Sequence, residues 1–205
     1  RLSPDGKQLC WLTWNHPNMP WDGTELWVGD LSADGLSVSA PRLVAGGLEE
    51  SIFQPEWSPA GTLTFVSDRS GWWNLYQERD REIVALHPRE AEFGHPQWVF
   101  GMTSYGFASD DRIICTFTER GLWSIADLNV PSGELTGVPT PFTDVSGLVV
   151  QGEIAVFRGG SATMPSSVFR HDLKTGDTIK LRQSSDTIPD AGYLSNPEAI
   201  EFPTT

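Results

Sequence analysis

The sequence repeats a short strand motif four times at an almost constant interval. Each copy is an apolar or aromatic run, usually leading into an Asp-Leu pair, and the copies begin 49, 47 and 46 residues apart, at residues 26–28, 75–77, 122–124 and 168–170. One four-stranded blade of a β-propeller takes about 40 to 50 residues, and a single blade cannot bury both of its faces. The period therefore predicts an all-β fold: a β-propeller with about four blades of four antiparallel strands.

Turn sequences recur in register with this motif. Ser3-Pro4-Asp5-Gly6, Ser58-Pro59-Ala60-Gly61 and Ser109-Asp110-Asp111-Arg112 contain the residues that tight turns favour, and each precedes a mostly apolar strand. The chain opens inside the first of these turns, so we expect the first blade to lack its innermost strand. We therefore expect four blades of a larger propeller of about seven. Residues 1–186 would form the blades and residues 187–205 a linker.

Composition narrows the classes of partner. The chain has 205 residues, nine tryptophans and a net charge of −13, and its 14 basic residues are scattered, which excludes a nucleic-acid surface. No apolar run approaches the roughly 20 residues of a membrane span, and the amino end does not resemble a signal peptide. The sequence contains no set of residues with the spacing of metal ligands, so we expect neither a metal nor a cofactor. Cys10 and Cys115 occupy matching strands and are interpreted as buried free thiols, which indicates a reducing, cytoplasmic compartment.

The alternation of strand direction divides the connections between two faces of the propeller. One face receives short turns such as residues 32–35 and 131–133. The other receives longer, chemically richer loops, which we expect at residues 15–22, 48–51, 67–74, 92–95, 144–147 and 159–165. Because binding residues concentrate on loops that a rigid scaffold displays, we expect a substrate or partner on this second face.

Several of these segments resemble the propeller of serine peptidases of the prolyl oligopeptidase family, a group that includes acylaminoacyl peptidases and dipeptidyl or aminopeptidase relatives. The similarity is carried by residues 3–7, 11–22, 49–59 and 65–76, and Pro197-Glu198-Ala199-Ile200-Glu201-Phe202-Pro203 is similar to the segment that leads into the α/β-hydrolase domain of this family. The resemblance implies a parent protein that hydrolyses peptides with a Ser, Asp and His triad. It also implies that the propeller limits access to the catalytic domain and helps to shape its substrate pocket.

The chain itself offers no catalytic nucleophile. A Gly-x-Ser-x-Gly elbow is absent from the sequence, and the four histidines, His16, His87, His95 and His171, have no evident Ser and acid partners. We therefore expect no catalytic residue in this chain and no hydrolase activity from the chain alone.

Two small groups of residues are candidates for binding. Glu49 and Glu50 could bind a peptide ammonium group, as a glutamate pair does in some dipeptidyl peptidases of the family, although adjacent acids on a loop are more often solvated. Arg69 and Trp72, with the neighbouring Trp73, could contact substrate, or could form an ordinary turn with the tryptophans filling space between blades. Met19 and Trp21, held between prolines, could dock against a second domain or pack on each other.

Three functions remain open. The first is the binding and gating propeller of a serine peptidase, with the α/β-hydrolase domain and a peptide as partners. The second is a free-standing interaction propeller, and the third is a propeller hydrolase with its own acid site at Glu49 and Glu50. In the first case an open set of blades would expose apolar surface, so we expect self-association, whereas the second predicts a complete set of blades.

Overall fold

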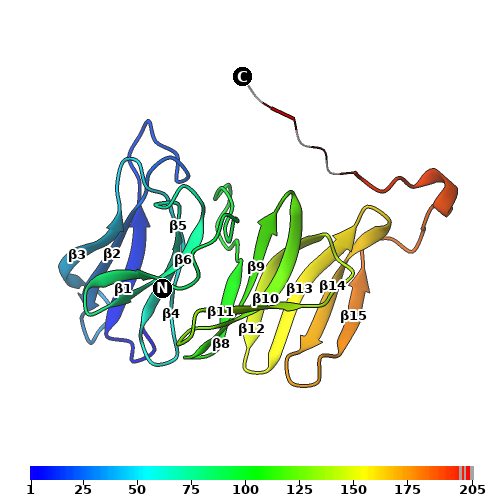
Figure 1. The fold of residues 1–205 in the computed structure, drawn as a ribbon. Coiled ribbons are helices and arrows are strands. Elements are labelled where there is room, and N and C mark those ends of the chain that lie inside the picture. Colours follow the sequence, from blue (N-terminus) through cyan, green and yellow to red (C-terminus); the bar gives the residue numbers. More distant parts are fainter. Residues whose placement is uncertain (199, 201, 204–205) are drawn as a thin grey trace.

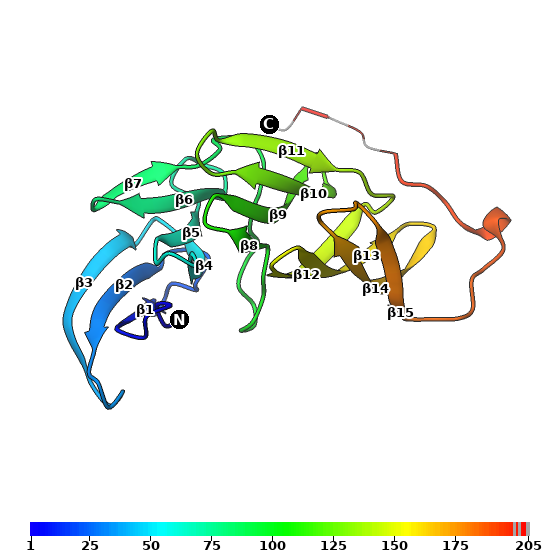
Figure 2. The same cartoon turned by 90° about the horizontal axis from the view of Figure 1, so that it is seen from below.

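The fold is an arc of four antiparallel β-sheets, each followed along the chain by the next. The computed structural model describes residues 1–198, 200, 202 and 203. Figures 1 and 2 show the sheets side by side, and Figure 2 places β4, β8 and β12 on the concave side of the arc and β7 and β11 on its outer side. The predicted all-β propeller with four blades is confirmed. Part of the segment assigned to a linker, residues 199, 201, 204 and 205, lies outside the described residues.

Each sheet follows the chain in simple up-and-down order. The first sheet has three strands: β1 (Gln8–Thr13), β2 (Glu25–Leu31) and β3 (Val38–Gly46). The second sheet has four strands: β4 (Ile52–Trp57), β5 (Leu63–Ser67), β6 (Asn74–Arg79) and β7 (Glu82–Ala85). The third sheet consists of β8 (Tyr105–Ser109), β9 (Arg112–Glu119), β10 (Leu122–Asn129) and β11 (Glu134–Val138).

The fourth sheet completes the arc and is followed by an extended segment. Its strands are β12 (Asp144–Gln151), β13 (Ile154–Ser161), β14 (Met164–Asp172) and β15 (Thr178–Gln183). After β15, a single 3-10 turn, η1 (Ala191–Tyr193), interrupts the segment. Within the described part of the chain, no helix is long and apolar enough to cross a bilayer.

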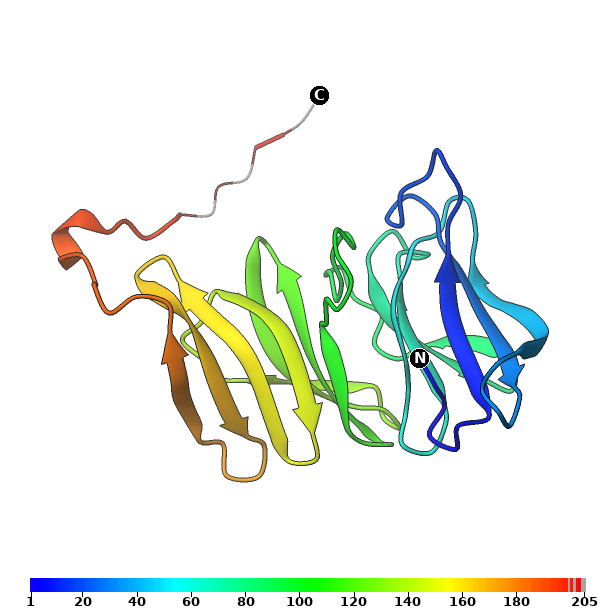
Figure 3. The same cartoon turned by 180° about the vertical axis from the view of Figure 1, so that it is seen from behind.

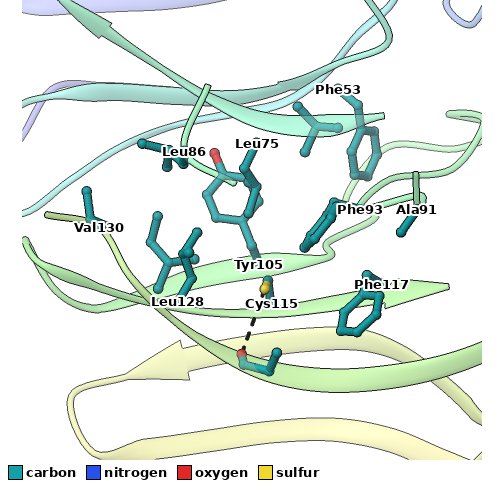
Figure 4. Packing of buried hydrophobic residues seen from close by; sticks show 13 residues of the cluster. Phe53, Leu75, Leu86, Ala91, Phe93, Tyr105, Cys115, Phe117, Leu128 and Val130 are labelled. Carbon is teal, nitrogen blue, oxygen red and sulfur yellow. Dashed lines mark hydrogen bonds between the residues drawn. The ribbon is translucent and has the colours of Figure 1, made fainter. Parts of the chain in front are cut away.

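Three apolar clusters fill the spaces between neighbouring sheets. The largest lies between the second and third sheets, and Figure 4 shows its side chains, among them Phe93 and Phe117, whose ring centroids are 5.3 Å apart. Two smaller clusters lie between the first and second sheets and between the third and fourth. Cys10 and Cys115 belong to two of these clusters as free, buried thiols, and burial raises the pKa of both. The core is therefore made between the blades and not within any one of them.

A polar link accompanies the largest cluster. Gln54 lies at a bulge of β4 with a φ of 47°, and its side chain is buried. Its amide donates to the carbonyl of Tyr105 at 2.8 Å and accepts from the N–H of Ser104 at 2.7 Å. The Tyr105 hydroxyl lies 2.8 Å from the carbonyls of Gln54 and Thr64. These bonds connect the inner strands of two blades.

Two loops expected from the sequence are instead strands. Residues 159–165 were expected to form a long loop, but β13 continues to Ser161 and β14 starts at Met164, which leaves a two-residue turn. Gly159 serves packing here, because a Cβ at this position would lie 2.8 Å from the ring of Phe142. Residues 144–147 lie within β12, where Gly147 has a φ of 63° at a bulge. The glycines in both segments made them look like loops in the sequence. In the structure these glycines lie within strands, where one allows close packing and the other forms a bulge.

Candidate functional site

The candidate residues gather on one face of the arc. Residues 14–24 connect β1 to β2 and residues 68–73 connect β5 to β6, and the segments 47–51 and 86–104 pass between sheets on the same face. In Figures 1 and 3 the loops of residues 14–24 and 86–104 stand at the upper edge of the sheets. The opposite face has short turns such as residues 32–37. The predicted division between turn face and loop face is confirmed for these connections.

Glu50 and Arg69 form an ion pair on the loop face. One carboxylate oxygen of Glu50, Oε1, accepts from Nε and Nη2 of Arg69 at 3.0 and 2.8 Å, and from the Ser67 hydroxyl at 2.6 Å. The guanidinium carbon of Arg69 lies 5.2 Å from the centroid of the Tyr76 ring. Because the Glu50 and Arg69 side chains are 21% and 31% exposed, the pair is accessible from solvent. It presents a carboxylate and a guanidinium in fixed positions.

Glu49 does not join this pair. Glu49 is exposed, and its carboxylate makes no hydrogen bond or ion pair with any of the described residues. The sequence predicted Glu49 and Glu50 as a pair of equivalent carboxylates. The structure brings together Glu50 and Arg69 and leaves Glu49 beside them in solvent.

Asp68 fixes the loop that carries Arg69. Its carboxylate accepts from the N–H of Ser51 at 2.7 Å, so the loop after β5 is tied to the residue before β4. Partial burial raises the pKa of the Asp68 carboxyl above its ordinary value of 3.8. This contact crosses between two segments of the chain.

The two neighbouring tryptophans of the same loop differ in environment. Trp72 is 39% exposed, so it remains available on the loop face. Trp73 packs against the largest apolar cluster, between the second and third sheets, and its ring stacks on Phe53 with centroids 6.1 Å apart. Trp73 therefore fills space between blades, which was the structural alternative for this pair.

Met19 and Trp21 line a groove that the sequence did not predict. Its volume is about 360 Å³. We call it the aromatic groove, and its side chains are those of Trp14, Met19, Pro20, Trp21, Gln97, Trp98, Val99 and Phe100. Trp21 packs on Trp98 with ring centroids 4.2 Å apart and an angle of 42° between the rings. The structure thus joins the loop after β1 to the segment before β8.

Hydrogen bonds hold one wall of the groove in place. The Pro20 carbonyl accepts from the hydroxyls of Thr24 and Ser51, and the Ser51 bond measures 2.9 Å. The N–H of Thr24 donates to the Glu50 carbonyl at 2.9 Å. These contacts place the aromatic groove directly beside the segment that bears the Glu50–Arg69 pair.

Sequence reasoning missed the other wall. Residues 97–100 contain Trp98, Val99 and Phe100, three large apolar side chains in succession that are 71%, 64% and 85% exposed. They lie outside the repeated strand motif and outside the segments that carry the family resemblance. A run of large apolar residues within a long connection that also contains Pro96 and Gly101 was the available signal. Within the described ranges, no group of three or more His, Cys, Asp or Glu side chains is placed to hold a metal ion.

Comparison with known proteins gives matches among solved structures alone. No model of a protein family and no curated protein matches the sequence. A puromycin-hydrolyzing peptidase of Mycobacterium tuberculosis is 36% identical, with a TM-score of 0.90, over 97% of this chain and 30% of that one. A puromycin hydrolase is also 36% identical, with a TM-score of 0.84, over 91% of this chain and 29% of the other. This chain therefore spans about a third of the length of these relatives.

A more distant structure has the same fold. Prolyl oligopeptidase B from Galerina marginata is 15% identical, with a TM-score of 0.68, over 89% of this chain and 25% of that enzyme. At this identity the match supports the fold and nothing finer.

Proposed function

Because this chain matches the propeller portion of peptidases of the prolyl oligopeptidase family, we propose that it is the substrate-facing, non-catalytic propeller of such an enzyme. An α/β-hydrolase domain would supply the catalytic triad. The observation that carries the proposal is 36% identity over 97% of the chain to a puromycin-hydrolyzing peptidase, together with the lack of a Gly-x-Ser-x-Gly motif in this sequence.

In this proposal the propeller admits small substrates and excludes folded proteins. Neighbouring blades are closed by continuous apolar clusters and by the Gln54–Tyr105 link, so a peptide cannot pass between them. Access would then be restricted to the loop face and the concave side. The parent enzyme would act on peptides and on small molecules such as the puromycin that gives these relatives their names.

The loop face would contribute binding contacts. Glu50 is fixed by Arg69 through its Oε1 atom, and its carboxylate would bind a positively charged group of the substrate. Glu49 and Trp72 would border this site as exposed neighbours, and Arg69 would hold Glu50 in position. Met19 and Trp21 border the same face from the aromatic groove.

The first test concerns the reading frame that encodes this chain. We expect the complete frame to contain Gly-x-Ser-x-Gly, and its product to hydrolyse a short peptide amide but not a folded protein that carries the same peptide sequence. The 205-residue chain alone should give no turnover. A complete frame without this motif, whose product does not hydrolyse peptides, would contradict the proposal and support a free-standing interaction propeller instead.

The second test concerns Glu50 within the complete enzyme. Glu50→Gln should lower kcat/KM for a positively charged peptide about tenfold, mainly through KM, because it removes a charge-assisted hydrogen bond. Glu90→Gln is a matched control, since Glu90 is an exposed carboxylate on another connection. Equal kinetics for the Glu50 variant and the wild type would exclude Glu50 from substrate binding.

A further inference from the structure

We propose that the aromatic groove binds one aromatic side chain of a peptide ligand. The inference names a binding subsite on the face that the proposed function assigns to substrate, and it therefore rests on that function. It differs from the expectation that Met19 and Trp21 dock against a second domain. It also gives a role to Trp98 and Phe100, which no sequence motif had suggested.

The groove is large enough to hold an aromatic side chain. Its volume of about 360 Å³ lies at the lower end of the range for small-molecule sites, which is about 300 to 1,000 Å³. Two loops of different origin line the groove, Trp21 from one and Trp98 from the other, and their rings pack directly on each other. An aromatic ring entering this space would meet ring faces and edges, the arrangement that aromatic pairs prefer.

The chemistry of the walls selects against negative charge. None of the lining residues is charged, and the amide of Gln97 is the one amide side chain among them. An anionic group bound there would lose hydration without gaining a counter-ion, which is costly. The chain as a whole carries a net charge of −13, which disfavours acidic ligands further. The walls therefore suit an aromatic group better than an acidic one.

The groove is also organised before any ligand binds. Asn18 donates to the Leu48 carbonyl at 3.0 Å, and Met19 donates its N–H to the Asp22 carboxylate at 2.8 Å. With the two hydroxyl bonds to the Pro20 carbonyl, these contacts fix the loop after β1 from several sides. A fixed wall lowers the conformational entropy that a ligand would otherwise have to order.

Polar and apolar residues both adjoin the groove. Asn15, His16 and Asp22 belong to the same loop and are exposed. Leu48, whose carbonyl accepts from Asn18, is 77% exposed.

The test is a titration of the 205-residue chain followed by NMR. N-acetyl-phenylalaninamide is the probe and N-acetyl-alaninamide is the control ligand. The indole N–H signals of Trp14, Trp21 and Trp98, assigned through single Trp→Phe variants, should shift with the aromatic probe. The signal of Trp27 should stay, because its indole is bonded to Thr13 and Glu25 on the first sheet. Phe100→Ala should raise the Kd on the order of fivefold.

A control variant separates the groove from general aromatic exposure. Tyr193→Ala removes a ring that is 87% exposed, against 85% for Phe100, and should change the Kd less than about twofold. Equal shifts with both ligands, or no shift of the three groove signals, would overturn the proposal. Groove signals that shift with protein concentration and are restored by Phe100→Ala would assign the groove to a second copy of the chain. Because this titration needs no catalysis, its failure is distinguishable from a failure of the hydrolysis tests.

Discussion

At the scale of single residues, His95 is a histidine held among aromatic rings. Its ring lies between those of Phe53 and Trp123, with centroids 5.4 and 5.6 Å away. Its Nε2 atom is buried and has no hydrogen-bond partner among the described residues. Burial lowers the pKa of His95 below its ordinary value of 6.5, because the charged form loses hydration.

This environment predicts a loss of stability in mild acid. The unfolded chain takes up a proton near pH 6.5, whereas the folded chain does so at a lower pH. The contribution of neutral His95 is therefore complete above pH 6.5 and is lost as the pH falls from 6.5 through the lowered pKa. Urea unfolding at pH 7.5 and pH 5 should show a smaller loss for His95→Phe than for the wild type. Identical losses would mean that His95 does not contribute to the acid sensitivity.

Residue chemistry explains which site residues the sequence could predict. Glu50 and Arg69 lie in segments that carry the family resemblance, so the sequence indicates both as candidates, although it does not indicate that they form an ion pair. Trp98 and Phe100 form a groove only together with the loop that carries Trp21. Trp21 packs on Trp98 although the two are 77 residues apart in sequence. Contacts of this kind between loops leave no periodic pattern, so the aromatic groove could not be predicted from the sequence.

At the scale of elements, the inner strands of two blades are joined by one side chain. Gln54 both donates to β8 and accepts from the N–H that precedes it, and it does so from a bulge of β4. Because its amide replaces backbone pairing that two separate sheets cannot make, Gln54 satisfies polar groups that would otherwise be buried without partners.

Removal of this link should destabilise the chain. Gln54→Ala leaves the Ser104 N–H and the Tyr105 carbonyl without their partner, which should lower the free energy of unfolding by about 1–3 kcal/mol. Gln151→Ala is a suitable control, because Gln151 is an exposed residue at the end of β12. Denaturant unfolding measures both. Equal stability of the two variants would show that water or rearrangement replaces the link.

Strand order was more predictable than strand ends. Turn residues such as Ser58-Pro59-Ala60-Gly61 fix φ and a hairpin locally, so the order of strands could be predicted. Gly159 and Gly147 are also glycines, yet one allows Phe142 to pack and the other forms a bulge. Sequence cannot distinguish these uses of glycine, because the deciding neighbour lies on another segment.

At the scale of the whole molecule, the two end sheets each have an uncovered face. On the first sheet, Trp11, Trp27 and Leu43 lie opposite one another in register across β1, β2 and β3, on the side away from the second sheet. Leu43 is 48% exposed there, and on the fourth sheet Val149 is 60% exposed. In a propeller with this repeat of 46 to 49 residues, each blade packs both of its faces against neighbouring blades. The uncovered faces of the two end sheets are therefore surfaces of the kind that a neighbouring blade would cover.

Such faces predict self-association of the isolated chain. Contiguous apolar patches of this kind usually mark interaction surfaces. Sedimentation should show oligomers at micromolar concentration, and Leu43→Glu should shift the distribution toward monomers. Leu36→Glu is the control, because Leu36 is 86% exposed in the turn after β2 and outside the face. A chain that stays monomeric at all concentrations would contradict this expectation.

The placement of the three apolar clusters between sheets has a consequence for anyone who wishes to shorten this polypeptide. A cut at any connection between sheets separates the two halves of a cluster and uncovers both. No single sheet encloses a core of its own, so the smallest piece able to hold its shape is two adjacent sheets with the cluster between them. Truncation libraries should therefore be planned in pairs of repeats, with β4 to β11 as the pair that keeps the largest cluster intact.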